Sequence, residues 1–226
     1  MKNNDDAKKS VIDFLLAEYN EMNAERNRLR EEGLKRLNFF ITITTSVIGG
    51  LTVLAGWSPI TTYQFQLIAI VAFFFLLIIG WGTFRFSIYR DIDLDYQIRS
   101  IARIRRYFLN LDSSIHKFLS EEKDDDEPTR YITGENISSF RTTTHMILSF
   151  FFSTIGGLVV NMFFGNVLIS VLVVLIGFPL AFFGLDNYIK NMFKRALENA
   201  KKSVQFPKTQ EAVLPVDKKS KKTTAS

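Results

Sequence analysis

The chain has 226 residues, with 28 Lys and Arg against 23 Asp and Glu, a net charge of +5, and no cysteine. The lack of cysteine excludes disulfides and any thiolate metal site or nucleophile. The charges are unevenly placed, because residues 37–84 and residues 142–185 contain no Asp, Glu, Lys or Arg. About 20 apolar residues span a bilayer, so each charge-free block predicts two membrane crossings rather than a pair of very apolar soluble helices.

The first half of the chain predicts a cytosolic helix followed by a transmembrane hairpin. In residues 1–37, side chains such as Leu15, Tyr19 and Met22 recur at alternating steps of four and three, which is typical of a helix. Gly33, near the membrane end of this helix, is a candidate bend. Residues 38–84 form the first hairpin. Its spans, 38–56 and 64–84, are separated by "GWSPITTY", whose proline cannot continue a helix.

The second half repeats this plan after a central cytosolic segment. An apolar stripe close to a 3.5-residue period predicts an amphipathic helix, which we expect to pack on the first cytosolic helix as an antiparallel stalk. An acidic linker and a restarted helix lead into the second hairpin, and a basic cytosolic tail follows, its end expected to be disordered. These parts are the helix 85–122, the linker and restart 123–143, the hairpin 144–185 with spans 144–163 and 167–185, and the tail 186–226.

The predicted fold class is therefore an all-α, polytopic membrane protein with four transmembrane helices in two antiparallel hairpins and long cytosolic helical extensions. All Lys and Arg residues lie outside the spans, and the two short turns contain none of them. Positively charged loops stay on the cytoplasmic side, so both termini and the central loop are expected in the cytoplasm. The expected location is the bacterial inner membrane, as a multi-pass protein.

A short sequence occurs twice, once in the first span of each hairpin. "SVIGGLTVL" (46–54) returns as "STIGGLVVN" (153–161), with six of nine positions identical. Both hairpins start from the cytoplasm, so the repeat predicts a parallel pseudo-repeat about an axis along the membrane normal. Both spans carry small and hydroxyl-bearing residues in a stripe: Thr42, Thr45, Ser46, Gly49, Gly50, Thr52, Ser149, Ser153, Gly156, Gly157 and Asn161.

Two uses of these stripes remain open. Small residues let helix backbones approach closely, which favours packing of the first and third spans within one chain or between subunits. The alternative is a water-exposed lining of a pore. A single four-helix bundle has no room for a conduit, so a pore would require an oligomer.

A basic edge lies on the central cytosolic helix. Arg99, Arg103 and Arg106 fall at i, i+4 and i+7, with Arg105 beside them. This edge is a candidate contact for a phosphate-bearing ligand, an inner-leaflet lipid or an acidic partner. The alternative is ordinary ion pairing with nearby acidic side chains: Asp95 in the favourable i−4 position, and Glu18, Glu21 and Glu25 across the stalk.

Other functional classes find little support in the sequence. The spans contain no ionisable residue except His145 near the inner boundary, whereas proton relays and ion sites need one at depth. There is no phosphate-binding Gly-rich loop, and the two histidines, 116 and 145, have no partner set for catalysis or metal binding. We therefore predict no enzyme activity and no cofactor. Aromatic residues do not alternate with basic ones, so direct nucleic-acid binding is disfavoured.

The first half resembles a group of small prokaryotic membrane proteins. The order of a cytosolic helix, "RLNFFITITTSVIGGLTVL", a short turn, an apolar span and "YRDIDLDYQIRSIARIRRYF" is similar to two-span proteins such as the SLATT-type domains of antiviral and conflict systems. Four-span subunits also occur in such systems, as in Kiwa and beside certain RNA-guided nucleases. The resemblance covers roughly residues 10–120 and rests on topology and charge placement.

The resemblance implies a membrane sensor or effector that perturbs the membrane when a cytosolic partner signals. The expected function is thus an oligomeric module that couples a cytosolic protein partner to the transmembrane bundle, with pore opening as one form of output. The alternative is a non-conducting scaffold that anchors a cytosolic enzyme or complex. In both cases the expected partners are the lipid bilayer, further copies of the chain and a cytosolic protein.

Overall fold

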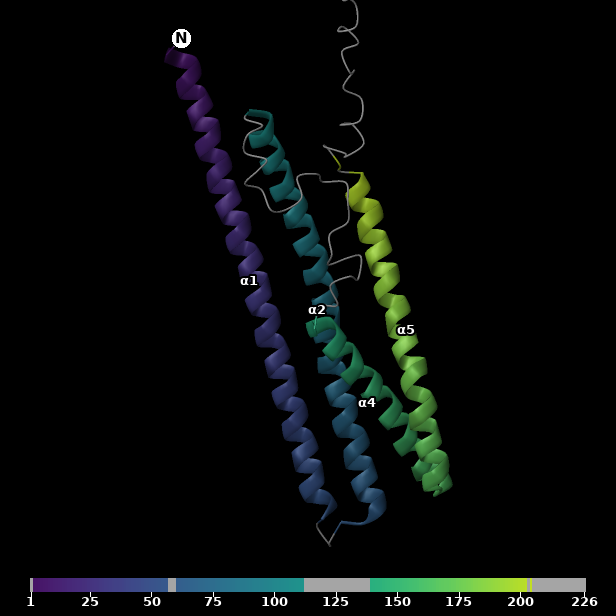
Figure 1. Cartoon of the computed structure of the whole chain (residues 1–226). Helices are drawn as coiled ribbons and strands as arrows, with labels where there is room; N and C mark the ends of the chain where they lie inside the picture. The colour runs from purple at the N-terminus through teal and green to yellow at the C-terminus, as the bar shows by residue number, and fades with distance from the viewer. Residues whose placement is uncertain (1, 57–59, 112–138, 203, 205–226) are drawn as a thin grey trace, which may run out of the picture.

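The computed structural model describes residues 2–56, 60–111, 139–202 and 204, and these contain four α-helices and no strand (Figure 1). All four helices are long and apolar enough to cross a membrane. The all-α class and the number of candidate spans are therefore confirmed. The helices are α1 (Lys2–Ala55), α2 (Thr62–Leu111), α4 (Ser139–Phe164) and α5 (Val167–Lys201).

Each helix of the first pair joins a charged part and an apolar part without interruption. The 54 residues of α1 run through Gly33, and the 50 residues of α2 continue from the apolar block into the charged segment. At 1.5 Å per residue, α1 is about 80 Å long. The predicted central helix is described only as far as Leu111. The rest of that helix, the linker to 138, and most of the tail beyond 202 lie outside the described residues.

The turn before α2 is closed by a reciprocal capping box. The backbone N–H of Thr61 donates to Gln64 Oε1 at 3.1 Å, and the backbone N–H of Gln64 donates to Thr61 Oγ1 at 3.3 Å. This pattern satisfies donors that the first turn of a helix leaves unpaired.

The turn between α4 and α5 depends on two residues. Gly165 has φ +62°, a conformation that favours glycine, and its N–H donates to the carbonyl of Asn161 at 2.9 Å. Asn166 then caps α5, because its Oδ1 accepts from the backbone N–H groups of Leu168 and Ile169. The chain thus reverses within the short "FGN" segment that the sequence predicts as a turn.

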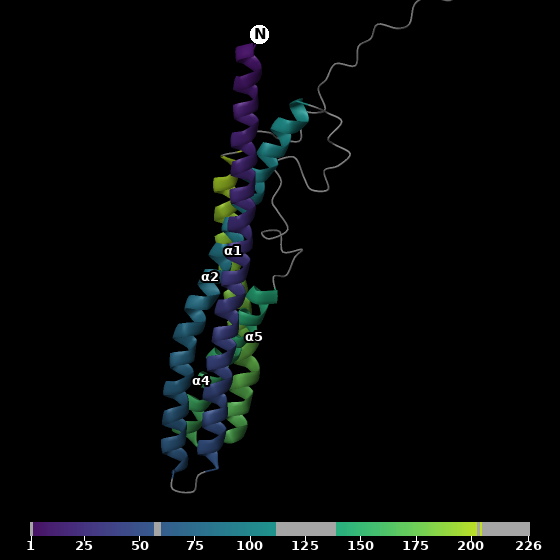
Figure 2. The same ribbon diagram turned by 90° about the vertical axis from the view of Figure 1, so that its left-hand side faces the viewer.

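The helices pack in sequence, with α2 between α1 and α4, and α4 against α5 (Figures 1 and 2). One buried group joins Phe40 of α1, Leu76 of α2 and Phe151 of α4. Gly80 of α2 makes room for it, since a Cβ at this position would lie 2.8 Å from the Phe40 ring. A second group lies towards the charged parts of the helices and brings in α5: Phe84, Ile88, Leu148, Leu185, Ile189 and Phe193.

The outer faces of α2 and α5 are bulky and apolar. Phe74, Phe75 and Ile78 of α2 and Leu172 and Leu175 of α5 all point away from the bundle. Such large exposed apolar surfaces are unfavourable in water but suit lipid. The exposure of these two faces therefore agrees with a place for α2 and α5 in the membrane.

Candidate functional site

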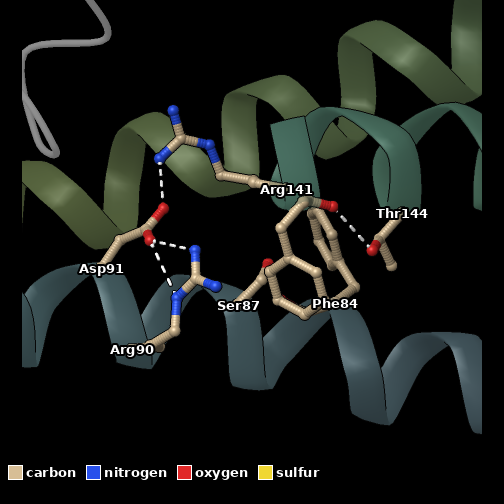
Figure 3. A network of polar contacts seen from close by, with 7 residues as sticks. Phe84, Ser87, Arg90, Asp91, Arg141 and Thr144 are labelled. Carbon is tan, nitrogen blue, oxygen red and sulfur yellow. Dashed lines mark hydrogen bonds and ion pairs between the residues drawn. The ribbon is translucent and has the colours of Figure 1, made fainter. Parts of the chain in front are cut away.

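A buried ionic cluster lies where the helices pass from the apolar blocks into their charged segments. Asp91 of α2 is fully buried, and each of its carboxylate oxygens accepts from an arginine (Figure 3). Arg90 donates to Oδ1 from Nη2 at 2.8 Å and from Nε at 3.3 Å, and Arg141 of α4 donates to Oδ2 from Nη1 at 2.8 Å. We refer to Arg90, Asp91 and Arg141 as the Asp91 cluster.

Aromatic rings cover both arginines of the cluster. The Arg90 guanidinium lies 4.5 Å from the centre of the Phe140 ring, and the Arg141 guanidinium lies 4.9 Å from the centre of the Phe193 ring of α5. The face of an aromatic ring attracts a cation, and more strongly when water is excluded. The rings therefore hold the two charges in place while shielding them from solvent.

At the Asp91 cluster, α1 contributes no side chain but leaves space for one at Gly33. A Cβ at Gly33 of α1 would collide with Nη1 of Arg90 and lie 3.1 Å from its Cδ. Glycine at this position therefore lets α1 approach the Arg90 side chain. With Gly33, the Asp91 cluster and Phe193, all four helices meet at one point.

The electrostatics of the cluster are those of a strongly desolvated carboxylate. Burial raises the pKa of Asp91 above its ordinary value, while Arg90 and Arg141 oppose this rise through their charges and hydrogen bonds. A buried ion pair gains little net stability, because desolvation consumes much of the Coulombic gain. Its main effect is to fix how α2 and α4 are placed relative to each other.

On the membrane side of the cluster, two hydroxyl side chains donate hydrogen bonds to carbonyls of their own helices and permit close packing. Ser87 of α2 donates to the carbonyl of Phe84 at 2.7 Å, and Thr144 of α4 donates to the carbonyl of Phe140 at 2.9 Å. Both hydroxyls are fully buried between α2 and α4. They act as small side chains that need no partner across the interface.

His145 of α4, the residue after Thr144, contacts α5. Its Nε2 lies 2.9 Å from the carbonyl oxygen of Phe182, and its ring stacks on the Phe182 ring with centres 4.1 Å apart. The Phe84 ring of α2 also lies near it, at 5.9 Å between ring centres. The structure thus places His145 in a packing and hydrogen-bonding role.

The basic edge predicted on the central helix is engaged in local contacts. Arg99 is 3% exposed, and its Nε donates to Asp95 Oδ2 at 2.8 Å, which is the i−4 pairing considered from the sequence. The Arg105 guanidinium lies 6.0 Å from the Tyr19 ring of α1. Arg103, Arg105 and Arg106 are partly buried and have further interaction partners.

The two stripes of small residues lie in different surroundings. Ser149, Ser153 and Gly157 of α4 are buried, and a Cβ at Gly157 would lie 3.1 Å from the Ser170 carbonyl of α5. Gly156 also faces α5, with Val173 as its nearest neighbour. On α1 the predicted residues are exposed, and the structure does not bring them against α4: Thr42, Thr45, Ser46, Gly49, Gly50 and Thr52.

The Asp91 cluster is the feature that sequence reasoning missed. Asp91 and Arg141 are 50 positions apart, and each stands in a segment with other charges, so spacing gives no sign that they pair. A weak signal exists in Arg141 itself, which directly precedes a charge-free block and follows Phe140. Among the described residues, no group of three or more His, Asp or Glu side chains could hold a metal ion.

Comparison with known proteins places the chain in no described family. No family model matches it, and neither a curated protein nor a solved structure shows significant similarity to it.

Proposed function

We propose that the chain is an oligomeric membrane module that couples a cytosolic signal or protein partner to its transmembrane bundle. In this proposal the spans form two antiparallel hairpins related as a parallel pseudo-repeat, in a bacterial inner membrane with both termini cytoplasmic. The one-sided distribution of Lys and Arg supports this orientation. The resemblance to membrane subunits of antiviral systems supports a role in defence.

The Asp91 cluster is the observation that carries the proposal. Because α2 is one continuous helix, a rotation or shift of its cytosolic half moves Asp91 and Arg90 with it. Arg141 holds Asp91 from α4, at the point where α4 enters its apolar segment. In this proposal, a force on the stalk reaches the second pair of helices through this desolvated ionic contact, which switches between a paired and a broken state.

Two outputs follow from such a coupling, and they belong to different functional classes. In the first, movement of α4 and α5 opens a path for ions between subunits. In the second, the module is a non-conducting scaffold that holds a cytosolic complex at the membrane. The exposed hydroxyls of α1 favour the second in one respect, because Thr42 and Ser46 already donate to carbonyls of their own helix at 2.8 Å. These hydroxyls therefore need no water in a pore as a hydrogen-bond partner.

Ion flux through reconstituted protein separates the two. We expect liposomes containing the Asp91→Asn protein to leak ions faster than those containing the unaltered chain, because the neutral amide weakens the link to Arg141. Lys190→Met is the matched control, since Lys190 forms an ion pair with Asp186 on the exposed surface of α5. Tight liposomes for the unaltered chain and for Asp91→Asn, with circular dichroism showing intact helices, would overturn the pore and leave the scaffold.

A further inference from the structure

The exposed apolar face of α2 ends at a cation. Val71 and Ile78 are 63% and 57% exposed, and the exposed Arg85 follows after another seven residues, so the three lie on one side of the helix. Gly82 lies between Ile78 and Arg85, and no atom is found within 4 Å of a Cβ built on it. We refer to Val71, Ile78 and Gly82 as the apolar track, which is open along its length and leads to Arg85.

Arg85 stands at the boundary of the first charge-free block. Residues 37–84 contain no Asp, Glu, Lys or Arg, so Arg85 is the first charged residue after the apolar part of α2. Trp81 lies one turn before it and Tyr89 one turn after it. Trp and Tyr side chains favour the level of the lipid headgroups in a membrane. The apolar track therefore ends at the level where the phosphates of one leaflet are expected.

Arg85 pairs with no carboxylate in the described part of the chain, and its contacts there are with a neutral side chain. Its Nη2 donates to the Tyr89 hydroxyl oxygen at 3.3 Å, and its guanidinium carbon lies 5.7 Å from the centre of the Tyr89 ring. A guanidinium carries five N–H donors in a fixed plane. Arg85 therefore keeps its positive charge and most of its donors for a ligand outside the chain.

A second arginine at the same level shows the contrast. Arg36 of α1 lies beside this part of α2, because its guanidinium carbon is 4.0 Å from the centre of the Phe86 ring. Unlike Arg85, it forms an ion pair with a carboxylate, since its Nη2 donates to Glu32 Oε1 at 3.3 Å. Two cations at one level thus differ in whether the chain supplies their anion.

Two further hydrogen-bond donors flank Arg85. Neither the indole N–H of Trp81 nor the O–H of Tyr89 has an acceptor among the described residues. The Trp81 ring is held against α5, with its centre 5.5 Å from that of Tyr188. Three donors around one positive charge suit an anion with several oxygens, and a guanidinium binds phosphate through two parallel hydrogen bonds.

We infer that Trp81, Arg85 and Tyr89 bind the phosphate of an anionic membrane lipid, whose acyl chain lies along the apolar track. Free phosphate offers the same oxygens but has no chain for the track. The bound lipid sets the depth of α2, the helix that carries Asp91, and so sets the level at which Arg141 pairs with it. This inference rests on the proposed membrane function, because a lipid reaches the site only where α2 spans the bilayer.

Quenching of Trp81 fluorescence by brominated lipids tests the site. Trp57→Phe leaves Trp81 as the only tryptophan of the chain. This protein is reconstituted into phosphatidylcholine vesicles that contain the same fraction of either brominated phosphatidylglycerol or brominated phosphatidylcholine. We expect phosphatidylglycerol to be preferred beside Trp81 about fivefold, which is the gain that one arginine obtains at an anionic lipid surface.

The preference should depend on Arg85 itself and not on the net charge. Arg85→Gln should abolish the preference. Arg36→Gln removes the same charge at the same level, but from a side chain that is paired with Glu32, so it should leave the preference unchanged. Circular dichroism checks that each variant keeps its helix content. Loss of the preference in both variants, or in neither, would overturn the site.

A milder variant tests the geometry while it keeps the charge. Tyr89→Phe removes the hydroxyl that accepts from Arg85 and leaves the ring, so we expect the preference to fall about twofold. An unchanged preference would reduce the site to a surface charge and overturn the proposed arrangement.

The remaining outcomes separate this inference from the proposed function. If inorganic phosphate displaced the brominated phosphatidylglycerol from Trp81, the site would be one for free phosphate and the lipid would be ruled out. Equal quenching by the two lipids would also overturn the lipid site, but the membrane function would stand, because quenching itself places Trp81 in the bilayer. Absence of quenching by either lipid would take α2 out of the membrane and overturn the proposed function as well.

Discussion

At the scale of single residues, the Asp91 cluster shows how a buried charge fixes position rather than adding stability. Arg90 and Arg141 each satisfy one oxygen of the same carboxylate, and aromatic rings cover both cations. Removing one partner strands the others away from water, and this loss exceeds what the pair gained on forming. Variants of the cluster should therefore lose more stability than variants of exposed ion pairs.

Replacing Arg141 with Met tests this expectation. The variant loses the 2.8 Å hydrogen bond to Asp91 and the contact with Phe193, so we expect the free energy of unfolding to fall by about 2 kcal/mol. Lys190→Met removes an ion pair whose lysine is 71% exposed and should change it by less than about 1 kcal/mol. Unfolding in detergent, followed by circular dichroism, measures both. Equal losses would contradict the special role of the cluster.

Gly33 has a steric role that its sequence position did not reveal. The sequence suggests a bend, whereas the structure shows an uninterrupted helix whose missing side chain leaves room for Arg90. Gly33→Ala should therefore lower stability, because Arg90 is held by Asp91 and cannot move freely. Gly82→Ala is the control: nothing lies within 4 Å of its Cβ, so helix propensity should stabilise that variant by up to about 1 kcal/mol. A stabilising Gly33→Ala, found by the same unfolding measurement, would refute the steric argument.

At the scale of helices, local sequence signals predict where α1 ends and where α5 begins, but not which helix faces pack together. The first predicted span ends at 56 and α1 at Ala55, and the predicted start of the fourth span coincides with Val167. These ends are predictable because Pro cannot continue a helix and Gly allows the chain to turn, and both act locally. The sequence does not predict which stripe is buried, because the repeat carries no information on which helix packs against which. The α4 stripe faces α5, while the α1 stripe is exposed.

The turn between α4 and α5 depends on two residues that act locally. Gly165→Ala places a side chain at φ +62° and should cost about 1 kcal/mol, and Asn166→Ala removes the cap of α5 at a similar cost. Gly184→Ala, in an open position of α5, should cause no loss. Thermal unfolding of the three variants, followed through helix content, tests this expectation. Equal stability for all three would mean that contacts between the helices alone determine the turn.

At the scale of the whole molecule, the charges are separated along the length of the helix bundle. The end of α1, the start of α2 and the turn between α4 and α5 lie at the same end of the bundle (Figures 1 and 2). The two connecting segments contain no Lys or Arg. The charged halves of α1, α2 and α5 extend towards the opposite end. An orientation that put this charged end outside the cell would move many cations across the membrane, which the positive-inside rule disfavours.

Cysteine labelling of intact cells tests the orientation, because the natural chain gives no background. Thr62→Cys and Val167→Cys, both exposed beside the turns, should react with a membrane-impermeant maleimide added outside the cells. Asn27→Cys and Lys202→Cys, both exposed in the charged half, should react only after the membrane is permeabilised. The permeabilised sample is the control for intrinsic reactivity at every site. Labelling of Lys202→Cys in intact cells would invert the bundle and place the Asp91 cluster at the outer surface, where no cytosolic partner could act on it.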